Sequence, residues 1–497
     1  MSPMLALYSW PAISAFILNK LRFPLAVLVV LFAGYLLLPV KYAIDFPMIP
    51  PMDKHAIPVM TIMAAVVLMS SLRESAPNQS GLLPKSLLAQ GLIALLVLGA
   101  IGTAMTNGDR IVTPLEVKNG LRLYDGISMG INYAILILPV LIGRKYFART
   151  DAHRLILIVF CIAACCYSFL ALFEVRMSPQ LNRWFYGFSP HSWRQHVRGG
   201  GFRPMVFLEH GLRVSMFFAL ALIATLGLFR MGWKPGFTLL AAGWLAATLV
   251  LTKSLGAVII ALLIVPMVFF LNTRALILAA AVIGGIALTY PVLRSAGFIP
   301  YERVLALAAK VDEQRARSFT TRLENEDILL DRATARPIFG WGGFGRSRVR
   351  DEKGRDIVIP DGYWVIIIGV GGWARYIGEF GLMTVPMVFL FLRRREMKIT
   401  RDTAILSIML AGNMIDLIPN SGQTPLTWLI AGALWGRLEL GAKDQEDPVD
   451  GGNGDGGSDV KSVPSYTRDF GARHPPRKLP VVYDRRDRQI KRRPSMF

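Results

Sequence analysis

Long apolar blocks alternate with short charged stretches along most of this chain. A helix needs about 20 apolar residues to cross about 30 Å of hydrocarbon, and twelve blocks approach that length. They run over residues 23–40, 57–72, 87–105, 126–142, 155–173, 205–228, 237–251, 256–271, 276–292, 363–392, 404–419 and 424–438. The pattern predicts an all-α polytopic membrane protein with about twelve transmembrane helices.

The tenth block, 363–392, is too long for one plain helix. Gly369, Gly371, Gly372 and Gly378 lie inside it, and glycines at this density interrupt helical patterns. Irregular backbone at membrane depth needs protein partners for its polar groups. We therefore expect the first part of this block to be re-entrant or to lie in the membrane interface.

Clusters of Lys and Arg in short loops predict the orientation, because such loops stay in the cytoplasm. One cluster precedes the fifth block and another follows the tenth: Arg144, Lys145, Arg149 and Arg154, then Arg393, Arg394, Arg395, Lys398 and Arg401. Twelve spans place both clusters and both termini in the cytoplasm. The predicted order is a cytoplasmic N-terminus (1–22), nine helices (23–292), a large external loop (293–360), three helices (361–438) and a disordered cytoplasmic tail (439–497).

Composition supports a membrane protein and excludes several other classes. The 497 residues are 53% hydrophobic and 18% charged, against about 25% charged in ordinary soluble domains, so soluble, coiled-coil, collagen-like and disordered chains do not fit. The net charge of +21 must be interpreted by the side of the membrane that the Lys and Arg residues occupy. We therefore expect no nucleic-acid partner. Cys161, Cys165 and Cys166 share one apolar block, which predicts neither a disulfide framework nor a metal site.

The loop 174–204 does not fit this orientation. It would be external, yet it carries five arginines against one acid, Glu174. The arginines are Arg176, Arg183, Arg194, Arg198 and Arg203. Interleaved aromatics such as Trp184 and Trp193 are typical of a headgroup interface. Either the topology is wrong here, or these arginines form an interfacial patch for anionic membrane lipid or lipid-linked phosphate, which is the interpretation we prefer.

Inside the large loop, Thr321 and Glu324 fit a capping box that opens a helix through about residue 335. Arg322 would then lie in the first turn, where backbone N–H groups favour an anion and a guanidinium adds a bidentate phosphate partner. The alternative is an ion pair between Arg322 and Glu326, four residues on. The glycine-rich run 337–345 follows, and such a turn lets the backbone approach another backbone or a ligand closely.

Several motifs, taken in order, resemble the O-antigen ligase and polysaccharide polymerase superfamily over roughly residues 200–395. The clearest is an arginine, a helix and a P-x-x-G-x-G run, here Arg322 and 337–342. The others are 201–204 before the sixth block, 251–257 around a predicted break, and 361–364 followed by 378–381. The resemblance implies a GT-C-like fold with a periplasmic loop in the bacterial inner membrane. It also implies inverting, metal-independent and cofactor-free transfer from an undecaprenyl-diphosphate-linked glycan to a sugar hydroxyl of a glycan or lipid acceptor.

The resemblance assigns Arg203 and Arg322 to the diphosphate leaving group, where fixed cations stabilise developing charge. Asp361 stands where many relatives have a histidine, and Leu255 where many have an arginine. Asp361 could act as a general base or cap the following helix, and Tyr363 could position the sugar. The two departures favour a polymerase of O-antigen or exopolysaccharide repeat units over a ligase that transfers glycan to lipid A core.

Charged residues in or beside the spans complete the candidate substrate-binding set, because intramembrane charges need partners. Glu209 and Arg213 stand four apart in the sixth block and could pair with each other. Alternatively, Glu209 or His210 lines an acceptor cavity. Arg332 is a further candidate, and Lys253, Glu379, Asn413 and Asp416 are lesser ones, each of which could simply be an interfacial residue.

Two functions of other classes stay open. A transporter or flippase of lipid-linked sugars should have inverted repeats, and we find no internal repeat in this sequence. A non-catalytic assembly subunit is also compatible with the sequence. The enzyme that we favour would work in the cell envelope, with a chain-length regulator or export machinery as a further partner.

Overall fold

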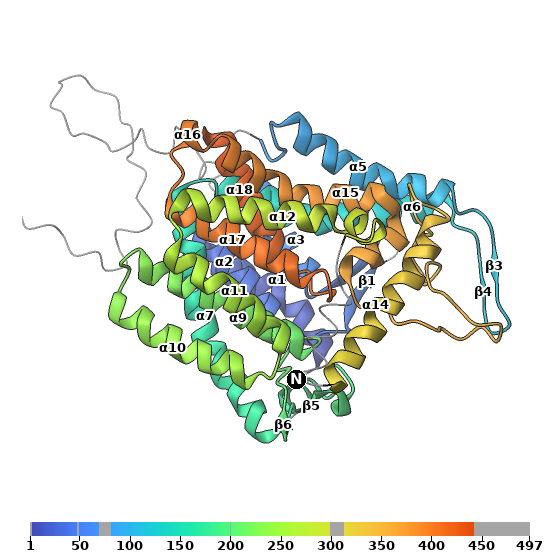
Figure 1. The fold of residues 1–497 in the computed structure, drawn as a ribbon, viewed down its shortest axis with the longest axis horizontal. Coiled ribbons are helices and arrows are strands. Elements are labelled where there is room, and N and C mark those ends of the chain that lie inside the picture. Colours follow the sequence, from blue (N-terminus) through green and yellow to red (C-terminus); the bar gives the residue numbers. More distant parts are fainter. Residues whose placement is uncertain (1, 47–48, 69–80, 199, 299–312, 442–497) are drawn as a thin grey trace, which may run out of the picture. The chain divides into compact units, whose positions relative to one another are not determined.

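Each predicted apolar block overlaps a helix in the computed structural model, whose described residues are 71% helical (Figure 1). The structure describes residues 2–46, 49–68, 81–198, 200–298 and 313–441, all in the first of two units, Met1–Gly456. The expected disordered tail therefore lies outside the described residues, except for its first three positions. Those positions, 439–441, belong to the end of the last helix and its cap.

The helices that match the predicted blocks are α2 (Phe23–Leu37), α3 (Ala56–Leu68), α5 (Leu87–Met105), α6 (Leu123–Tyr146), α7 (Thr150–Met177), α9 (Gly211–Arg230), α10 (Pro235–Leu251), α11 (Leu255–Phe270), α12 (Thr273–Ser295), α15 (Tyr363–Leu392), α17 (Arg401–Asp416) and α18 (Pro425–Leu440). Among the described helices, α5, α6, α7, α9, α12 and α15 are long and apolar enough to cross a membrane. The fold is thus consistent with an all-α membrane protein, while twelve spans and an external loop stay predictions.

Apart from a helix at the N-terminal end, the remaining described elements connect these helices. They are β1 (Ala43–Phe46), β2 (Ile49–Asp53), β3 (Ile111–Val112), β4 (Val117–Lys118), α8 (Leu181–Tyr186), η1 (Trp193–His196), β5 (Val197–Arg198), β6 (Gly201–Phe202), α14 (Glu313–Thr334) and α16 (Arg394–Met397). The strands form three antiparallel two-stranded hairpins, β1–β2, β3–β4 and β5–β6.

The apolar pattern did not predict the first helix. Pro3–Lys20 form helix α1 within the segment 1–22, whose cytoplasmic location stays a prediction. Polar residues and Pro11 interrupt its hydrophobic run. Leu7 and Trp10 of α1 are buried in a small cluster with Leu38 and Ile57, so α1 packs against the start of the bundle.

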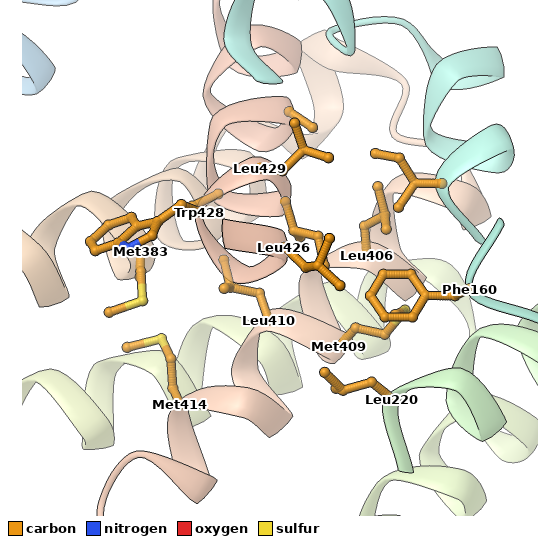
Figure 2. Packing of buried hydrophobic residues seen from close by; sticks show 14 of the residues in the cluster. Phe160, Leu220, Met383, Leu406, Met409, Leu410, Met414, Leu426, Trp428 and Leu429 are labelled. Atoms are coloured by element: carbon orange, nitrogen blue, oxygen red, sulfur yellow. The ribbon is translucent and has the colours of Figure 1, made fainter. Parts of the chain in front are cut away.

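The interior is built from helices that bury most of their surface. Figure 2 shows Leu410 of α17 between Trp428 of α18 on one side and Phe160 and Leu220 on the other, with Met414 of α17 next to Met383. Each of these side chains is at most 8% exposed. Close packing of this kind fixes the helix ends relative to one another, and those ends carry the candidate residues.

Helix α15 is broken at Gly372, as expected from its glycines. Gly372 has φ +64° and ψ −166°, values outside the helical region. The glycine-rich loop fills the break by backbone hydrogen bonds: Trp341 N–H to Gly369 O, Gly342 N–H to Val370 O, Trp373 N–H to Pro337 O and Ala374 N–H to Ile338 O. The loop therefore supplies partners to four backbone groups that the break leaves open.

We expect Gly340→Ala to destabilise the protein and Gly343→Ala to leave it nearly unchanged. A Cβ on Gly340 would lie 2.6 Å from Gly372 N, at a φ of +66°, whereas one on Gly343 meets no atom within 4 Å. The strain alone is worth about 1–3 kcal/mol. Melting temperatures in detergent measure the difference. Equal values for the two variants would show that the loop does not need this close approach.

A candidate anion-binding site at one end of the bundle

Four predicted cations from separate elements lie at one end of the helix bundle. Arg203 precedes α9, Arg213 is in its first turn, Lys253 lies in the turn between α10 and α11, and Arg322 lies in α14. We call these four residues the cation cluster. Their contacts join the turn before α9, the α10–α11 turn, α14 and the loop 417–424, which connects α17 to α18.

Arg203 joins two of these turns. Its guanidinium Nη2 donates to the backbone oxygen of Lys253 at 3.0 Å, and its side chain is 9% exposed. Lys253 has a φ of +55°, so the predicted break between the seventh and eighth blocks is a tight turn in a strained conformation. The resemblance motif at 201–204 thus contacts the motif at 251–257, although 50 residues separate Arg203 from Lys253.

The turn that carries Arg203, Glu209 and His210 is held from below by Glu174. The Glu174 carboxylate, fully buried, accepts hydrogen bonds from the backbone N–H groups of Leu181, Met205 and Val206 at 2.7–2.8 Å. A carboxylate in a ring of N–H donors is well satisfied. In the sequence, Glu174 stands out only as the lone acid of its loop.

Lys54 holds the same turn from another side. Its ammonium donates to the backbone oxygen of Phe207 at 3.0 Å and lies 5.8 Å from the ring of Tyr35. Burial lowers the pKa of Lys54 to about 7, with Arg213 acting in the same direction and Glu209 opposing it. No sequence motif marked Lys54, although a lysine directly before an apolar block was the available signal.

The structure pairs Arg322 with Asp361. Arg322 Nε lies 3.3 Å from Asp361 Oδ2, and both side chains are about one-third exposed. Arg322 also donates to Pro419 O at 3.4 Å. The two residues with the most specific predicted roles are therefore in direct contact.

Two local predictions around this pair are wrong. Helix α14 begins at Glu313, so Thr321 and Glu324 lie in its interior and form no capping box, and Arg322 is not in a first turn. The S/T-x-x-E pattern does not specify an end when the preceding residues are also helical. Asp361 does not cap α15 either, because the N-cap is Gly362 and no side-chain capping bond is present. The interpretation of Asp361 as a helix cap is therefore wrong, and its role as a general base stays a prediction.

The predicted pair of Glu209 and Arg213 is present, at 2.9 Å. However, α9 begins at Gly211, so Glu209 and His210 lie in the turn before the helix and not within the sixth span. Arg213 also donates to the backbone oxygens of Ser421 and Gln423 at 3.3 and 3.5 Å. The pair thus ties the start of α9 to the loop 417–424.

His210 caps α9 and belongs to a cluster of three histidines. Its Nδ1 accepts from Leu212 N–H at 3.1 Å. The ring lies 5.0 Å from His191 and 4.8 Å from His196, measured between centroids. Burial, then the two histidines, Arg203 and Arg322, lower the pKa of His210 to about 3. His210 is therefore neutral at pH 7, and within the described residues no group of His, Cys, Asp and Glu is arranged to hold a metal ion.

Tyr363 is an internal brace and does not face an open site. It is 8% exposed, and its hydroxyl lies 2.5 Å from both Glu379 Oε2 and Gln423 Oε1. Glu379, fully buried, pairs with Arg375 at 2.7 Å. The predicted sugar contact by Tyr363 has no geometric support, because its polar atom is already engaged in holding the loop 417–424.

Arg332 lies away from the cation cluster. Its guanidinium stacks on the ring of Trp341 at 3.4 Å, and Trp341 Nε1 donates to Arg332 O at 2.7 Å. Arg336 also lies over this ring and pairs with Asp109 at 2.9 Å. Figure 1 places the C-terminal end of α14 near the end of α5, where Arg336 also contacts Thr106 O. The expected substrate-binding role of Arg332 is thus separate from the cluster.

A small cavity opens beside Arg213. Its volume is about 20 Å³, and its lining includes Tyr35, Asn413, Gly422 and Thr424. That volume has room for about one water, so a sugar would have to bind outside it, towards the exposed Arg322–Asp361 pair. Asn413 bonds to Thr427 inside the bundle, and Asp416 bonds to Asn420.

Comparison with known proteins gives no family. No protein-family model matches the chain, and no curated protein matches it. The arrangement itself defines the site: cations and imidazoles from five separate segments at one end of an apolar helix bundle, beside the partly exposed carboxylates of Glu209 and Asp361.

The buried carboxyl of Glu326 should make the stability of the protein depend on pH. Its carboxyl is 6% exposed and lies 3.4 Å from Trp364 Nε1. Burial raises its pKa from 4.5 to about 7. A carboxyl with a raised pKa stabilises the fold while protonated, so this contribution is complete below pH 4.5 and is lost as the pH rises through about 7.

We therefore expect the melting temperature to fall between pH 5 and pH 8, and to fall less in Glu326→Gln, which keeps an acceptor for Trp364. Glu324→Gln is the matched control, because Glu324 is exposed on the same helix. Thermal unfolding in detergent over this pH range measures the three slopes. Parallel slopes for all three proteins would contradict the assignment.

Proposed function

We propose that this protein transfers glycans from an undecaprenyl-diphosphate carrier at the external face of the bacterial inner membrane, polymerising O-antigen or exopolysaccharide repeat units. The cation cluster carries the proposal. It brings Arg203, Arg213, Lys253 and Arg322 together at one end of an apolar bundle, where a lipid-linked diphosphate would meet the protein. The motif resemblance covers three of these four positions.

Arginines suit the leaving group of this reaction. As the glycosyl bond breaks, negative charge grows on the diphosphate, and preorganised cations stabilise it without reorganisation. A guanidinium binds phosphate oxygens in a bidentate way that an ammonium cannot. Arg203, fixed by the Lys253 carbonyl, and Arg322, on α14, are the residues proposed for this contact.

The Arg322–Asp361 pair suggests how donor binding and base catalysis are linked. A diphosphate that binds Arg322 takes the place of the Asp361 carboxylate, which is about one-third exposed and held at 3.3 Å. The released carboxylate then accepts the proton of the acceptor hydroxyl, whose oxygen bonds to the anomeric carbon while the carbon–oxygen bond to diphosphate breaks. No cofactor takes part in this scheme.

The acceptor decides the type of enzyme. Transfer to another lipid-linked glycan makes a polymerase, and transfer to lipid A core makes a ligase. A chain-length regulator or export machinery fits the polymerase, whose termini would lie in the cytoplasm. The alternative functions from other classes of protein are a lipid-linked sugar transporter or flippase and a non-catalytic assembly subunit.

We expect Arg322→Lys to insert and fold normally but to lose about 100-fold in activity, because a point charge does not replace the planar fork. Arg355→Lys is the matched control, since Arg355 is 67% exposed and pairs only locally with Asp351. The measurement is polysaccharide length on a gel from a deletion strain complemented by each variant, with membrane protein levels checked. Full polymer length with Arg322→Lys would remove Arg322 from the leaving-group site.

The same gel distinguishes the candidate functions. Single lipid-linked repeats accumulating in the deletion strain identify a polymerase. Full-length polymer retained on the lipid carrier identifies a ligase. Normal surface glycan in the deletion strain contradicts both enzymes and favours the transporter or subunit.

Asp361→Asn is expected to abolish turnover while the protein still binds the lipid-diphosphate donor, because an amide cannot accept the proton. Asp351→Asn, in the same loop, should retain activity. Donor binding and transfer are measured separately on purified protein. Unchanged turnover in Asp361→Asn would leave that residue with only its pairing role.

A further inference from the structure

A second basic site lies at the opposite end of α15 from the cation cluster. A cavity of about 280 Å³ is formed where the start of α12 meets the end of α15 and helix α16. Four cations line it, Arg274, Arg394, Arg395 and Lys398, together with Thr273, Ile277 and Ile399. No acidic residue is among these lining residues.

The charge of this cavity is not cancelled by the neighbouring carboxylate. Glu396 points to Arg393, which does not line the cavity, and the two pair at 3.1 Å. Arg394 stacks on Phe391 at 4.2 Å and donates one N–H to Phe391 O, which orients the side chain and leaves further N–H donors in its fork. Arg274 comes from a different helix, so the cations converge from two elements.

The cavity is large enough for a ligand headgroup. Its 280 Å³ greatly exceeds the 20 Å³ of the cavity beside Arg213 and the roughly 10–15 Å³ that one water needs. Several arginines around a space of this size match a phosphate group, which guanidinium binds in a bidentate way. The chemistry shared by all fitting ligands is therefore a phosphate-bearing anion.

The surroundings favour a lipid over a soluble phosphate. Phe270, at the end of α11, is 86% exposed, and Leu392, at the end of α15, is 60% exposed. Leu278 follows the lining residue Ile277 and is 42% exposed. These apolar side chains stand next to the cationic segments in sequence, on helices whose composition suits hydrocarbon. Basic pockets between helices at a membrane surface are typical sites for anionic headgroups.

We propose that this cavity binds the phosphate headgroup of an anionic phospholipid, whose acyl chains lie on the apolar surfaces of α11, α12 and α15. The bound headgroup joins α12 to α15. These two helices are already linked by Thr384 Oγ1 to Gly284 O at 3.2 Å and Tyr376 hydroxyl to Ala287 O at 2.7 Å. The lipid therefore stabilises the contact between α12 and α15. The start of α15 lies at the opposite end of this helix pair.

The test compares lipid binding by the full chain in detergent, measured by native mass spectrometry and by melting temperature. The probes are phosphatidylglycerol, cardiolipin, zwitterionic phosphatidylcholine and inorganic pyrophosphate. We expect the first two to bind and to raise the melting temperature. Arg274→Gln/Arg394→Gln should weaken that binding about 25-fold, at about fivefold for each cation removed.

The matched control is Arg149→Gln/Arg393→Gln. It removes the same charge from two arginines that are 37% and 51% exposed, pair with Asp151 and Glu396, and do not line the cavity. Its lipid affinity should stay within about twofold of wild type. If the cavity variant misfolds, Arg395→Gln, which changes an exposed lining residue, should still lower the lipid affinity about fivefold.

Three results would overturn the proposal. Equal loss in the control variant would mean that surface charge in general, and not the cavity, attracts the lipid. Equal binding of phosphatidylcholine would exclude recognition of an anionic headgroup. Stabilisation by pyrophosphate as large as that by lipid would assign the cavity to a soluble phosphate.

Discussion

The four backbone hydrogen bonds between the glycine-rich loop and the break in α15 are the constraint on which the candidate site depends. A buried backbone group without a hydrogen-bond partner costs about 1–3 kcal/mol, and the break at Gly372 would leave such groups without this loop. Because the loop follows α14 directly, its insertion fixes the end of that helix against α15. Nearer to Arg322, the contact of Glu326 with Trp364 also holds α14 against α15, and the Arg322–Asp361 pair lies beside it.

Hydrophobic pattern was sufficient to predict most helices but not how their ends are held. The break in α15 and the turn at Lys253 were predictable, because glycines and a polar interruption mark them locally. Lys54, Glu174, His191 and His196 were not. Lys54 contacts Phe207, 153 residues away, and Glu174 contacts Val206, 32 residues away. Such contacts depend on packing that no short motif encodes.

The wrong local predictions share one physical cause. The capping box at Thr321 and the Asp361 cap were read from residue types that favour helix ends. In both places neighbouring interactions decide otherwise: α14 extends back to Glu313, and the Asp361 carboxylate pairs with Arg322. Tyr363 was likewise expected to face a sugar, but the buried carboxylate of Glu379 engages its hydroxyl. Tertiary partners thus outweigh capping preferences of about 1 kcal/mol.

Exposure separates the ion pairs of this end into permanent and exchangeable ones. Arg375 and Glu379 are 15% and 0% exposed, and breaking a buried pair of this kind leaves a costly unpaired charge. Arg322 and Asp361 are 34% and 37% exposed, where a pair contributes only about 0–1 kcal/mol. In the proposed reaction, an incoming diphosphate, with two phosphates and more charge than one carboxylate, would therefore replace Asp361 at small cost. Under the proposed function, the buried pairs hold the scaffold while the exposed pair opens to the donor.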